Sequence, residues 1–172
     1  MSNKSKLDTV ANIAIIVVCI IAAAILIRNN FLQPQQQQGN RPPEAEVGDQ
    51  LDALRPVIPA GSDRAMVVAL SPTCHFCNES MPFYKQLIDQ RNQSGSGVKV
   101  IAAVPRDEAK AEEQQKFATA GVQPDALVTV DFASIKVPGT PTILLVDKQG
   151  KVLDVWVGKL DASGEKDVLA KL

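Results

Sequence analysis

Apolar and polar positions divide the chain into stretches of different character. Residues 10–27 are apolar apart from Asn12, residues 28–46 are polar and rich in glutamine and proline, and residues 47–172 alternate between short apolar and polar runs. At about 1.5 Å per residue, a helix as long as the apolar stretch reaches across a bilayer core of about 30 Å. The pattern predicts a short N-terminus at 1–9, a transmembrane anchor at 10–27, a flexible linker at 28–46 and one folded domain at 47–172.

A cleaved signal peptide is the alternative interpretation of the apolar stretch. The run Ala22–Ala24 has the small side chains of a cleavage site. Apolar residues continue beyond it at Ile25–Ile27, and the whole run is long for a signal core. These features favour an uncleaved anchor.

Within residues 47–172, short apolar runs predict strands, and apolar residues at three- and four-residue steps predict helices. Met81, Tyr84 and Leu87 recur in this way after the first strand, and Pro82 is expected to kink that helix. Strand–helix alternation at the front and a hairpin plus a helix at the back give an α/β fold, with a mixed central sheet and helices on both faces. The predicted strands are 66–70, 98–104, 127–130, 142–146 and 151–157. One predicted helix starts near Cys74, a second covers 107–120, and a third runs from Asp161 or Ser163 to Leu172. One helical turn is predicted at 131–135, and turns are predicted over most of 55–64.

Charged residues around the apolar stretch set its expected orientation. Lys4, Lys6 and the amino terminus precede it, and Arg28 follows it. The positive-inside bias favours a cytoplasmic N-terminus and a domain on the extracytoplasmic (periplasmic) side of the cell membrane. The net charge of the chain is −1, which gives no electrostatic case for nucleic-acid binding.

Cys74 and Cys77 are separated by two residues and lie where a buried strand gives way to a helix. The third cysteine, Cys19, lies in the apolar stretch and is predicted to be a small apolar residue. Unpaired N–H groups in the first turn of a helix stabilise an anion, so the pKa of the Cys74 thiol is expected to be lowered and Cys74 to act as a nucleophile. Cys77, one turn on, can then attack a mixed disulfide formed by Cys74. The spacing therefore indicates redox chemistry.

Neither a metal nor another cofactor is expected. Cys74, His75 and Cys77 crowd one helix start and no fourth ligand is visible, whereas structural zinc takes four. Asn78 follows Cys77 at the position where attachment of a c-type haem needs histidine.

The residues around the cysteine pair resemble the thioredoxin-fold family. The resemblance is strongest to its TlpA-like branch of membrane-anchored proteins, which includes redoxins of the alkyl hydroperoxide reductase/thiol-specific antioxidant type. It covers roughly residues 47–172. It rests on Val47–Asp49, on Cys74–Cys77 after a strand, on Pro82, and on Val137–Thr142 before a strand, turn and strand.

The resemblance implies a thioredoxin-like fold and a thiol–disulfide oxidoreductase with the pair Cys74–Cys77 as catalytic residues. It implies a cis peptide bond at Thr140–Pro141 that faces the pair, with the backbone of Thr140 binding an extended substrate. His75 and Phe76 are expected to tune the pair or contact the substrate, and a cationic His75 would stabilise the thiolate. Protein thiols or disulfides are the expected substrates, and a membrane electron-transfer partner is expected as well.

The sequence departs from the family pattern around the pair. Thr73 replaces the tryptophan that thioredoxins carry before the first cysteine, Val68 replaces their buried acid, and Ser80 replaces the glutamate that is frequent in TlpA-like proteins. The group that manages protons for the resolving cysteine is therefore not evident. Glu79, beside Ser80, is a candidate, and a solvated surface position is its alternative interpretation.

Other functions stay open at this stage. In a thiol peroxidase, Ser71 would take the place of the peroxiredoxin threonine, but the proline of those proteins is Val67 here, and no partner arginine stands out beyond Arg106. In a non-catalytic binding module the cysteine pair would be incidental. The direction of exchange is open too, because TlpA-like relatives are mostly reductants whereas His75 favours an oxidant.

Overall fold

The computed structural model describes residues 16–18 and 42–172, which fall into separate units. Residues 16–18 are helical and expose their apolar side chains. The predicted N-terminus at 1–9, and most of the predicted anchor and linker, lie outside the described residues. Within the described residues, no helix is long and apolar enough to cross a membrane.

The folded unit begins at Pro42, earlier than its predicted start at Val47. Ala45 is only 4% exposed, and its backbone N–H donates to the carbonyl of Lys136 at 2.8 Å. Residues 42–46 look like linker because their composition is polar. The hydrogen bond from Ala45 to the loop at Lys136 cannot be predicted from local composition, and it places these residues in the domain.

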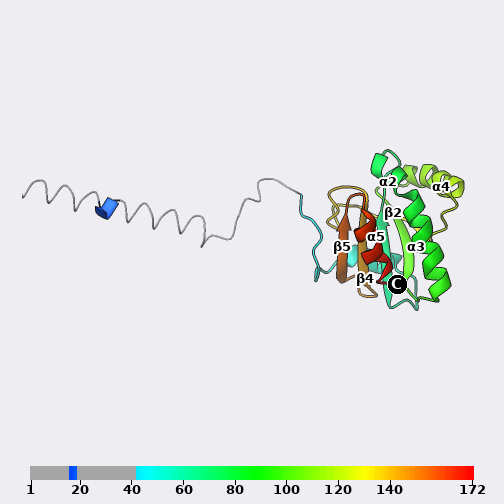
Figure 1. Ribbon diagram of the computed structural model, residues 1–172, viewed down its shortest axis with the longest axis horizontal. Helices are drawn as coiled ribbons and strands as arrows, with labels where there is room; N and C mark the ends of the chain where they lie inside the picture. Colours follow the sequence, from blue (N-terminus) through cyan, green and yellow to red (C-terminus); the bar gives the residue numbers. More distant parts are fainter. Residues whose placement is uncertain (1–15, 19–41) are drawn as a thin grey trace, which may run out of the picture. The chain divides into compact units, whose positions relative to one another are not determined.

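Helical and strand segments alternate in the first part of the folded unit, and three successive strands then precede the last helix (Figure 1). Each apolar run that predicts a strand forms one, with ends within two residues of those predicted. The elements are, in chain order, the 3-10 helix η2 (Asp52–Val57), β1 (Arg64–Ala69), α2 (His75–Glu79), α3 (Met81–Ser94), β2 (Lys99–Val104), α4 (Glu108–Ala120), β3 (Ala126–Thr129), β4 (Thr142–Asp147), β5 (Val152–Val157) and α5 (Ala162–Leu169).

In the described part of the chain, the strands form one sheet in the order β3-β2-β1-β4-β5. Strands β1, β2 and β3 are parallel, and β4 runs antiparallel to both β1 and β5. The predicted mixed sheet is thus confirmed. Strand β1 is buried from Ala65 to Ala69, as a central strand covered on both faces requires.

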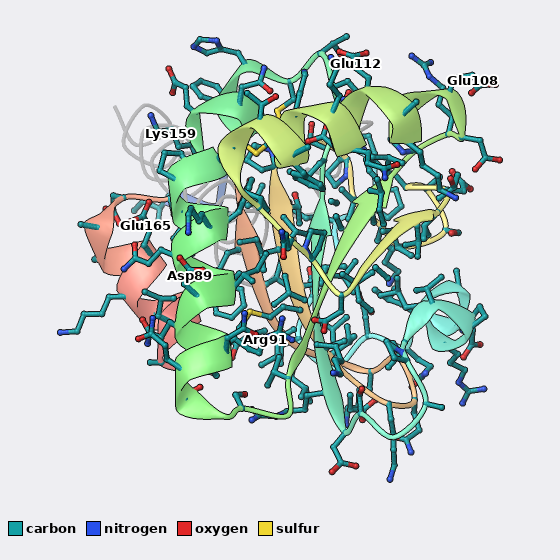
Figure 2. The ribbon with its side chains drawn as sticks, turned by 90° about the vertical axis from the view of Figure 1, so that its right-hand side faces the viewer. Asp89, Arg91, Glu108, Glu112, Lys159 and Glu165 are labelled. Carbon is teal, nitrogen blue, oxygen red and sulfur yellow. A yellow bond between two sulfur atoms is a disulfide. The ribbon has the colours of Figure 1, made fainter. Side chains whose placement is uncertain are left out.

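Alternate residues of β1 face two different apolar cores. Met66 and Val68 pack with residues of α2, α3, α4 and α5, whereas Val67 packs with residues of η2 and of segment 130–137. Figure 2 shows α3 and α4 in front of the sheet. They share a face because both β-α-β crossovers progress in the same direction and are right-handed. The flanking helices are confirmed, with the 3-10 helix on the second face.

Several local details differ from the prediction. Residues 55–57 lie in η2 although their proline content suggests a turn. Asp107 stands at the N-cap position of α4, as predicted, but makes no side-chain capping hydrogen bond: its backbone is helical, and its carboxylate accepts from the Thr129 hydroxyl instead. Where one helical turn is predicted at 131–135, residues 132–136 form turns, and α5 stops at Leu169 instead of Leu172.

Asp161 is the N-terminal cap of α5. Its carboxylate accepts hydrogen bonds from the backbone N–H groups of Ser163 at 3.1 Å and Gly164 at 2.8 Å. Of the two residues predicted as possible caps of the last helix, Asp161 and Ser163, the structure shows Asp161 in that role. These contacts hold the pKa of Asp161 below its usual value, with the Gly164 hydrogen bond as the main cause.

Candidate active site

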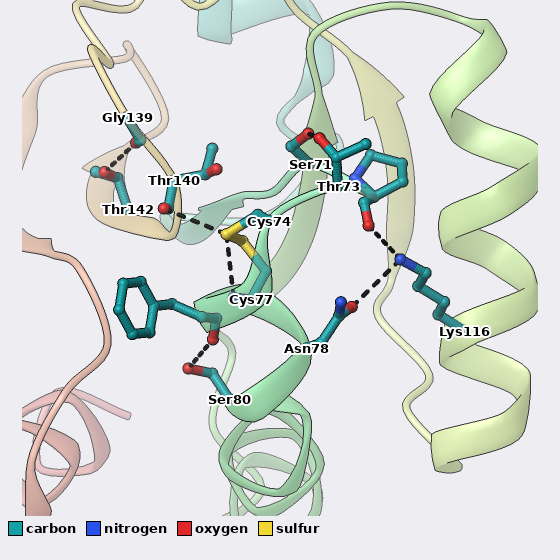
Figure 3. Close-up of a disulfide and its surroundings, with 12 residues drawn as sticks. Ser71, Thr73, Cys74, Cys77, Asn78, Ser80, Lys116, Gly139, Thr140 and Thr142 are labelled. Carbon is teal, nitrogen blue, oxygen red and sulfur yellow. Dashed lines mark hydrogen bonds between the residues drawn. A yellow bond between two sulfur atoms is a disulfide. The ribbon is translucent and has the colours of Figure 1, made fainter.

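Cys74 follows the end of β1 at the N-terminal cap of α2, and Cys77 lies inside α2 (Figure 3). The backbone N–H of Cys74 donates to the carbonyl of Ser71 at 2.9 Å, which closes a tight turn after the strand. Cys74 then takes an extended conformation and caps α2, and its sulfur accepts from the backbone N–H of Cys77. The predicted placement at a strand–helix junction is therefore found.

The helix after the pair is broken near Pro82. Helix α2 has only five residues, and Ser80 separates it from α3, where Pro82 lies in the first turn. A proline fits that turn because the N–H group that it lacks has no helical partner there. The predicted interruption of the helix is confirmed, and it takes the form of two successive helices.

The two cysteines form a disulfide, with Cα atoms 5.2 Å apart, and their exposure differs. Cys77 is fully buried, whereas Cys74 is partly exposed. The backbone N–H of Cys77 lies 3.1 Å from Cys74 Sγ, where it can stabilise negative charge on that sulfur. This geometry allows Cys74 to meet another thiol and keeps Cys77 behind it.

The loop at Thr140 and Pro141 faces Cys74. The Thr140–Pro141 peptide bond is cis, as predicted, and the carbonyl oxygen of Thr140 lies 3.3 Å from Cys74 Sγ (Figure 3). The hydroxyl of Thr142 donates to the Gly139 carbonyl at 2.8 Å, which fixes the turn. The backbone of Thr140 is therefore held directly beside the disulfide.

His75 and Phe76, the residues between the cysteines, both lie at the surface. The side chain of His75 is 77% exposed, and its Nε2 lies 2.9 Å from a carboxylate oxygen of Glu79. Phe76 is 53% exposed, which is uncommon for a large apolar side chain. The structure thus offers Phe76 as an apolar contact near the disulfide and gives His75 an acidic neighbour.

Glu79 is held in its ionised form by its neighbours. Lys159 Nζ donates to the Glu79 carboxylate at 2.6 Å, and this hydrogen bond is the main cause of a pKa below the usual value, with His75 contributing less. A carboxylate stabilised in this way accepts protons poorly near neutral pH. The solvated surface interpretation of Glu79 therefore fits the structure.

Helix α4 contributes residues to this region that the sequence analysis did not find. Lys116 Nζ donates to the carbonyl of Pro72 and lies 3.3 Å from the side-chain oxygen of Asn78 (Figure 3). Glu113, one turn earlier, is fully buried, and neither of its carboxylate oxygens has a hydrogen-bond partner among the described residues. The one signal in the sequence for the burial of Glu113 is its spacing: it lies four residues before Phe117, on the side of the helix where an apolar residue is expected.

The residues expected of a peroxidase are arranged differently. The hydroxyl of Ser71 lies 3.2 Å from that of Thr73, and Arg106 is exposed in the loop before α4. The Cys74 sulfur is in contact with Thr140 and Cys77 instead. The geometry favours dithiol chemistry.

A CXXC disulfide at a helix start, opposite a cis-proline loop and on a mixed sheet, defines a thioredoxin-type dithiol protein. The model of the thioredoxin-like domain family matches residues 52–172, and the chain belongs to that family. The family and the Cys74–Cys77 pair make the protein a thiol–disulfide oxidoreductase.

Solved structures share the fold at low sequence identity. A thiol-disulfide isomerase from Corynebacterium glutamicum is 17% identical with a TM-score of 0.51, and the match covers 77% of this chain and 97% of that one. StoA from Bacillus subtilis is 13% identical with a TM-score of 0.50, over 64% of this chain and 84% of that one. Among curated proteins, none matches the sequence significantly.

Proposed function

We propose that this protein is a membrane-anchored oxidoreductase that exchanges disulfides with protein thiols on the extracytoplasmic side of the cell membrane. The observation that carries the proposal is the unequal exposure of the pair: Cys74 is partly exposed beside the Thr140 backbone, and Cys77 is fully buried. A protein segment can align with that backbone and bring its sulfur to Cys74. The apolar stretch 10–27 behind Lys4 and Lys6 supports the anchor and its orientation.

The reaction is a pair of thiol–disulfide exchanges. With the pair reduced, the Cys74 thiolate attacks a substrate disulfide, forms a bond to one substrate sulfur, and releases the other as a thiolate. The Cys77 thiolate then attacks Cys74, the intramolecular disulfide forms, and the second substrate sulfur leaves as a thiolate. Two electrons pass from the pair to the substrate; with the pair oxidised, the same steps run in reverse.

A single-cysteine variant tests this assignment of roles. In the full chain, Cys77→Ser removes the resolving sulfur, so mixed disulfides between Cys74 and protein substrates are expected to accumulate on non-reducing gels and to disappear with reductant. Cys74→Ser is the matched control and is expected to trap no adducts, because Cys77 is buried and Cys19 lies in the apolar stretch 10–27. Equal trapping by both variants, or by neither, would contradict the proposal, and rapid consumption of hydrogen peroxide by Cys74 would favour a peroxidase instead.

The reduction potential of the pair sets the direction of exchange. A value near about −270 mV, as in thioredoxin, makes the protein a reductant that needs electrons from a membrane thiol carrier. A value near about −120 mV, as in DsbA, makes it an oxidant that forms disulfides. Equilibration of the full chain in glutathione buffers measures this quantity.

A further inference from the structure

Lys116 of α4 connects the two segments that flank the cysteine pair (Figure 3). Its Nζ donates to the carbonyl of Pro72, in the turn before the pair, and lies 3.3 Å from the side-chain oxygen of Asn78, directly after the pair. One ammonium group on a neighbouring helix therefore contacts both ends of the redox segment.

The position of Lys116 is itself fixed by its helix. The next residue, Phe117, is buried and packs in the same apolar core as Cys77. A carboxylate oxygen of Glu112, one turn earlier on α4, lies 3.4 Å from Lys116 Nζ, and the Lys116 side chain is only 28% exposed. Hydrogen bonds from a cation are roughly twice as strong as those between neutral groups, and partial withdrawal from water strengthens them further. The contacts of Lys116 with the two flanks can therefore restrain them.

The segment between these contacts has little structure of its own to hold it. Helix α2 has five residues and Ser80 separates it from α3, and so short a helix is not stable alone. The backbone N–H of Cys77 lies 3.1 Å from Cys74 Sγ, a contact that depends on the conformation of this helix start. With the pair oxidised, the disulfide fixes this conformation covalently. With the pair reduced, non-covalent contacts must hold it, and those of Lys116 lie at both ends.

We propose that Lys116 is a positioning residue that holds the reduced Cys74 and Cys77 in the arrangement from which the disulfide forms. The proposal rests on the oxidoreductase function and adds a residue to it. Lys116 acts through the Pro72 carbonyl and the Asn78 side-chain oxygen, and it gives up no proton and no electrons in the exchange. By restricting the reduced segment, it raises the effective concentration of the Cys77 thiolate at a mixed disulfide on Cys74. It therefore favours the disulfide at equilibrium and speeds the resolving step.

The equilibrium is tested with Lys116→Met in the full chain, which keeps the apolar stem and removes the ammonium group. All proteins in the test carry Cys19→Ala, so that thiol signals come from the pair alone. Without the two contacts, the reduced segment gains freedom and the reduced form is favoured. The equilibrium constant for disulfide formation in glutathione buffers is expected to fall about tenfold, as for loss of a hydrogen bond to a charged group, which raises the reduction potential by about 30 mV.

The sign of the change distinguishes restraint from charge. A cation that only stabilised the Cys74 thiolate would favour the reduced form, so its loss would lower the potential. A lowered or unchanged potential in Lys116→Met therefore overturns the proposal. Lys116→Arg keeps a cation with several donors and is expected to stay near the parent value. The matched control is Lys110→Met, which removes a lysine of the same helix that pairs with Asp107 at 3.2 Å, and it should leave the potential unchanged.

Ellman's reagent on the reduced proteins follows the resolving step. The first release of thionitrobenzoate reports attack by Cys74, and the second reports resolution by Cys77. In Lys116→Met the second release is expected to slow about tenfold, because a loose segment brings Cys77 to the mixed disulfide less often, while the first release stays unchanged. An unchanged second release contradicts the positioning role. Absence of an intramolecular disulfide in the unaltered protein would instead contradict the oxidoreductase function.

Asn78→Ala provides a test that stands even if Lys116→Met does not fold. It removes the Asn78 contact and leaves the Pro72 contact, so the potential is expected to rise, by less than in Lys116→Met. Because Lys116 and Asn78 share one contact, the double variant is expected to show no larger rise than Lys116→Met alone. An unchanged potential in Asn78→Ala, or additive rises in the double variant, overturns the proposal.

Discussion

At the scale of single residues, the ion pair of Arg91 and Asp125 joins α3 to the segment before β3. Asp125 accepts from Arg91 Nη1 at 2.6 Å and from the backbone N–H of Val100 at 2.8 Å. Burial alone would raise the pKa of Asp125, but these hydrogen bonds outweigh it and hold the pKa below the usual value. Since the folded-state pKa is lowered, the pair contributes stability above the unfolded pKa of about 3.9 and loses it as pH falls through the folded value.

Replacing the carboxylate is expected to remove this contribution. Asp125→Asn leaves the largely buried Arg91 without its counter-charge, so the free energy of unfolding at pH 7 should fall by about 3 kcal/mol. The variant should also lose less stability than the parent as the pH falls below the unfolded pKa of about 3.9, where the parent carboxyl begins to lose its contribution. Urea unfolding followed by circular dichroism measures both. Asp89→Asn, which breaks the exposed pair with Lys85, is the control and should cost less than about 0.5 kcal/mol; equal losses would contradict the expectation.

At the scale of elements, the β4–β5 hairpin depends on a close approach at Gly150. Its φ is +83°, and a Cβ atom there would lie 2.6 Å from the backbone oxygen of Leu51. Gly158, at the other end of β5, has a φ of +82° and open space around it. Both glycines have the same left-handed backbone conformation, but only at Gly150 would a side chain clash with another part of the chain. Comparing the two positions therefore separates the cost of backbone strain from the cost of a steric clash.

Alanine at each position should therefore give different losses of stability. Gly158→Ala is expected to cost about 1 kcal/mol, from the left-handed conformation alone. Gly150→Ala is expected to cost about 1–3 kcal/mol more, because the segment at Leu51 must move. Urea unfolding of the two variants provides the measurement. If Gly150→Ala loses no more stability than Gly158→Ala, the segment at Leu51 moves at little cost and the expectation is wrong.

At the scale of the whole molecule, the anchor and its orientation are the features to test. Val17→Lys places a charge in the apolar stretch at a cost of about 3 kcal/mol for a spanning helix, so more of the full chain should leave carbonate-washed membranes. Val157→Lys, at an exposed apolar position of β5, is the control and should fractionate like the parent. In intact cells, a membrane-impermeant maleimide added after a mild reductant should label Cys74. Labelling only after lysis would reverse the proposed orientation.

What the sequence could predict depends on whether the signal is local. Cys74 and Cys77 were found because their meaning lies in their spacing, and Pro141 was found because Val137–Thr142 resembles a segment of the thioredoxin-fold family. The strands were found because buried strands are continuous apolar runs. Glu113 and Lys116 gain their meaning only when α4 packs beside α2, and no spacing in the chain encodes that contact. The same holds for Ala45, whose pairing with a distant loop depends on the completed sheet.

The burial of Cys77 behind a partly exposed Cys74 also bears on oxidative damage. An oxidant from solvent meets Cys74 first and converts its thiolate to a sulfenic acid. Cys77, with its Cα atom 5.2 Å from that of Cys74, can condense with this sulfenic acid, release water and restore the disulfide before a second oxidant arrives. The fold therefore protects its own nucleophile: an encounter that would leave an isolated cysteine open to irreversible oxidation returns the protein to its oxidised working state.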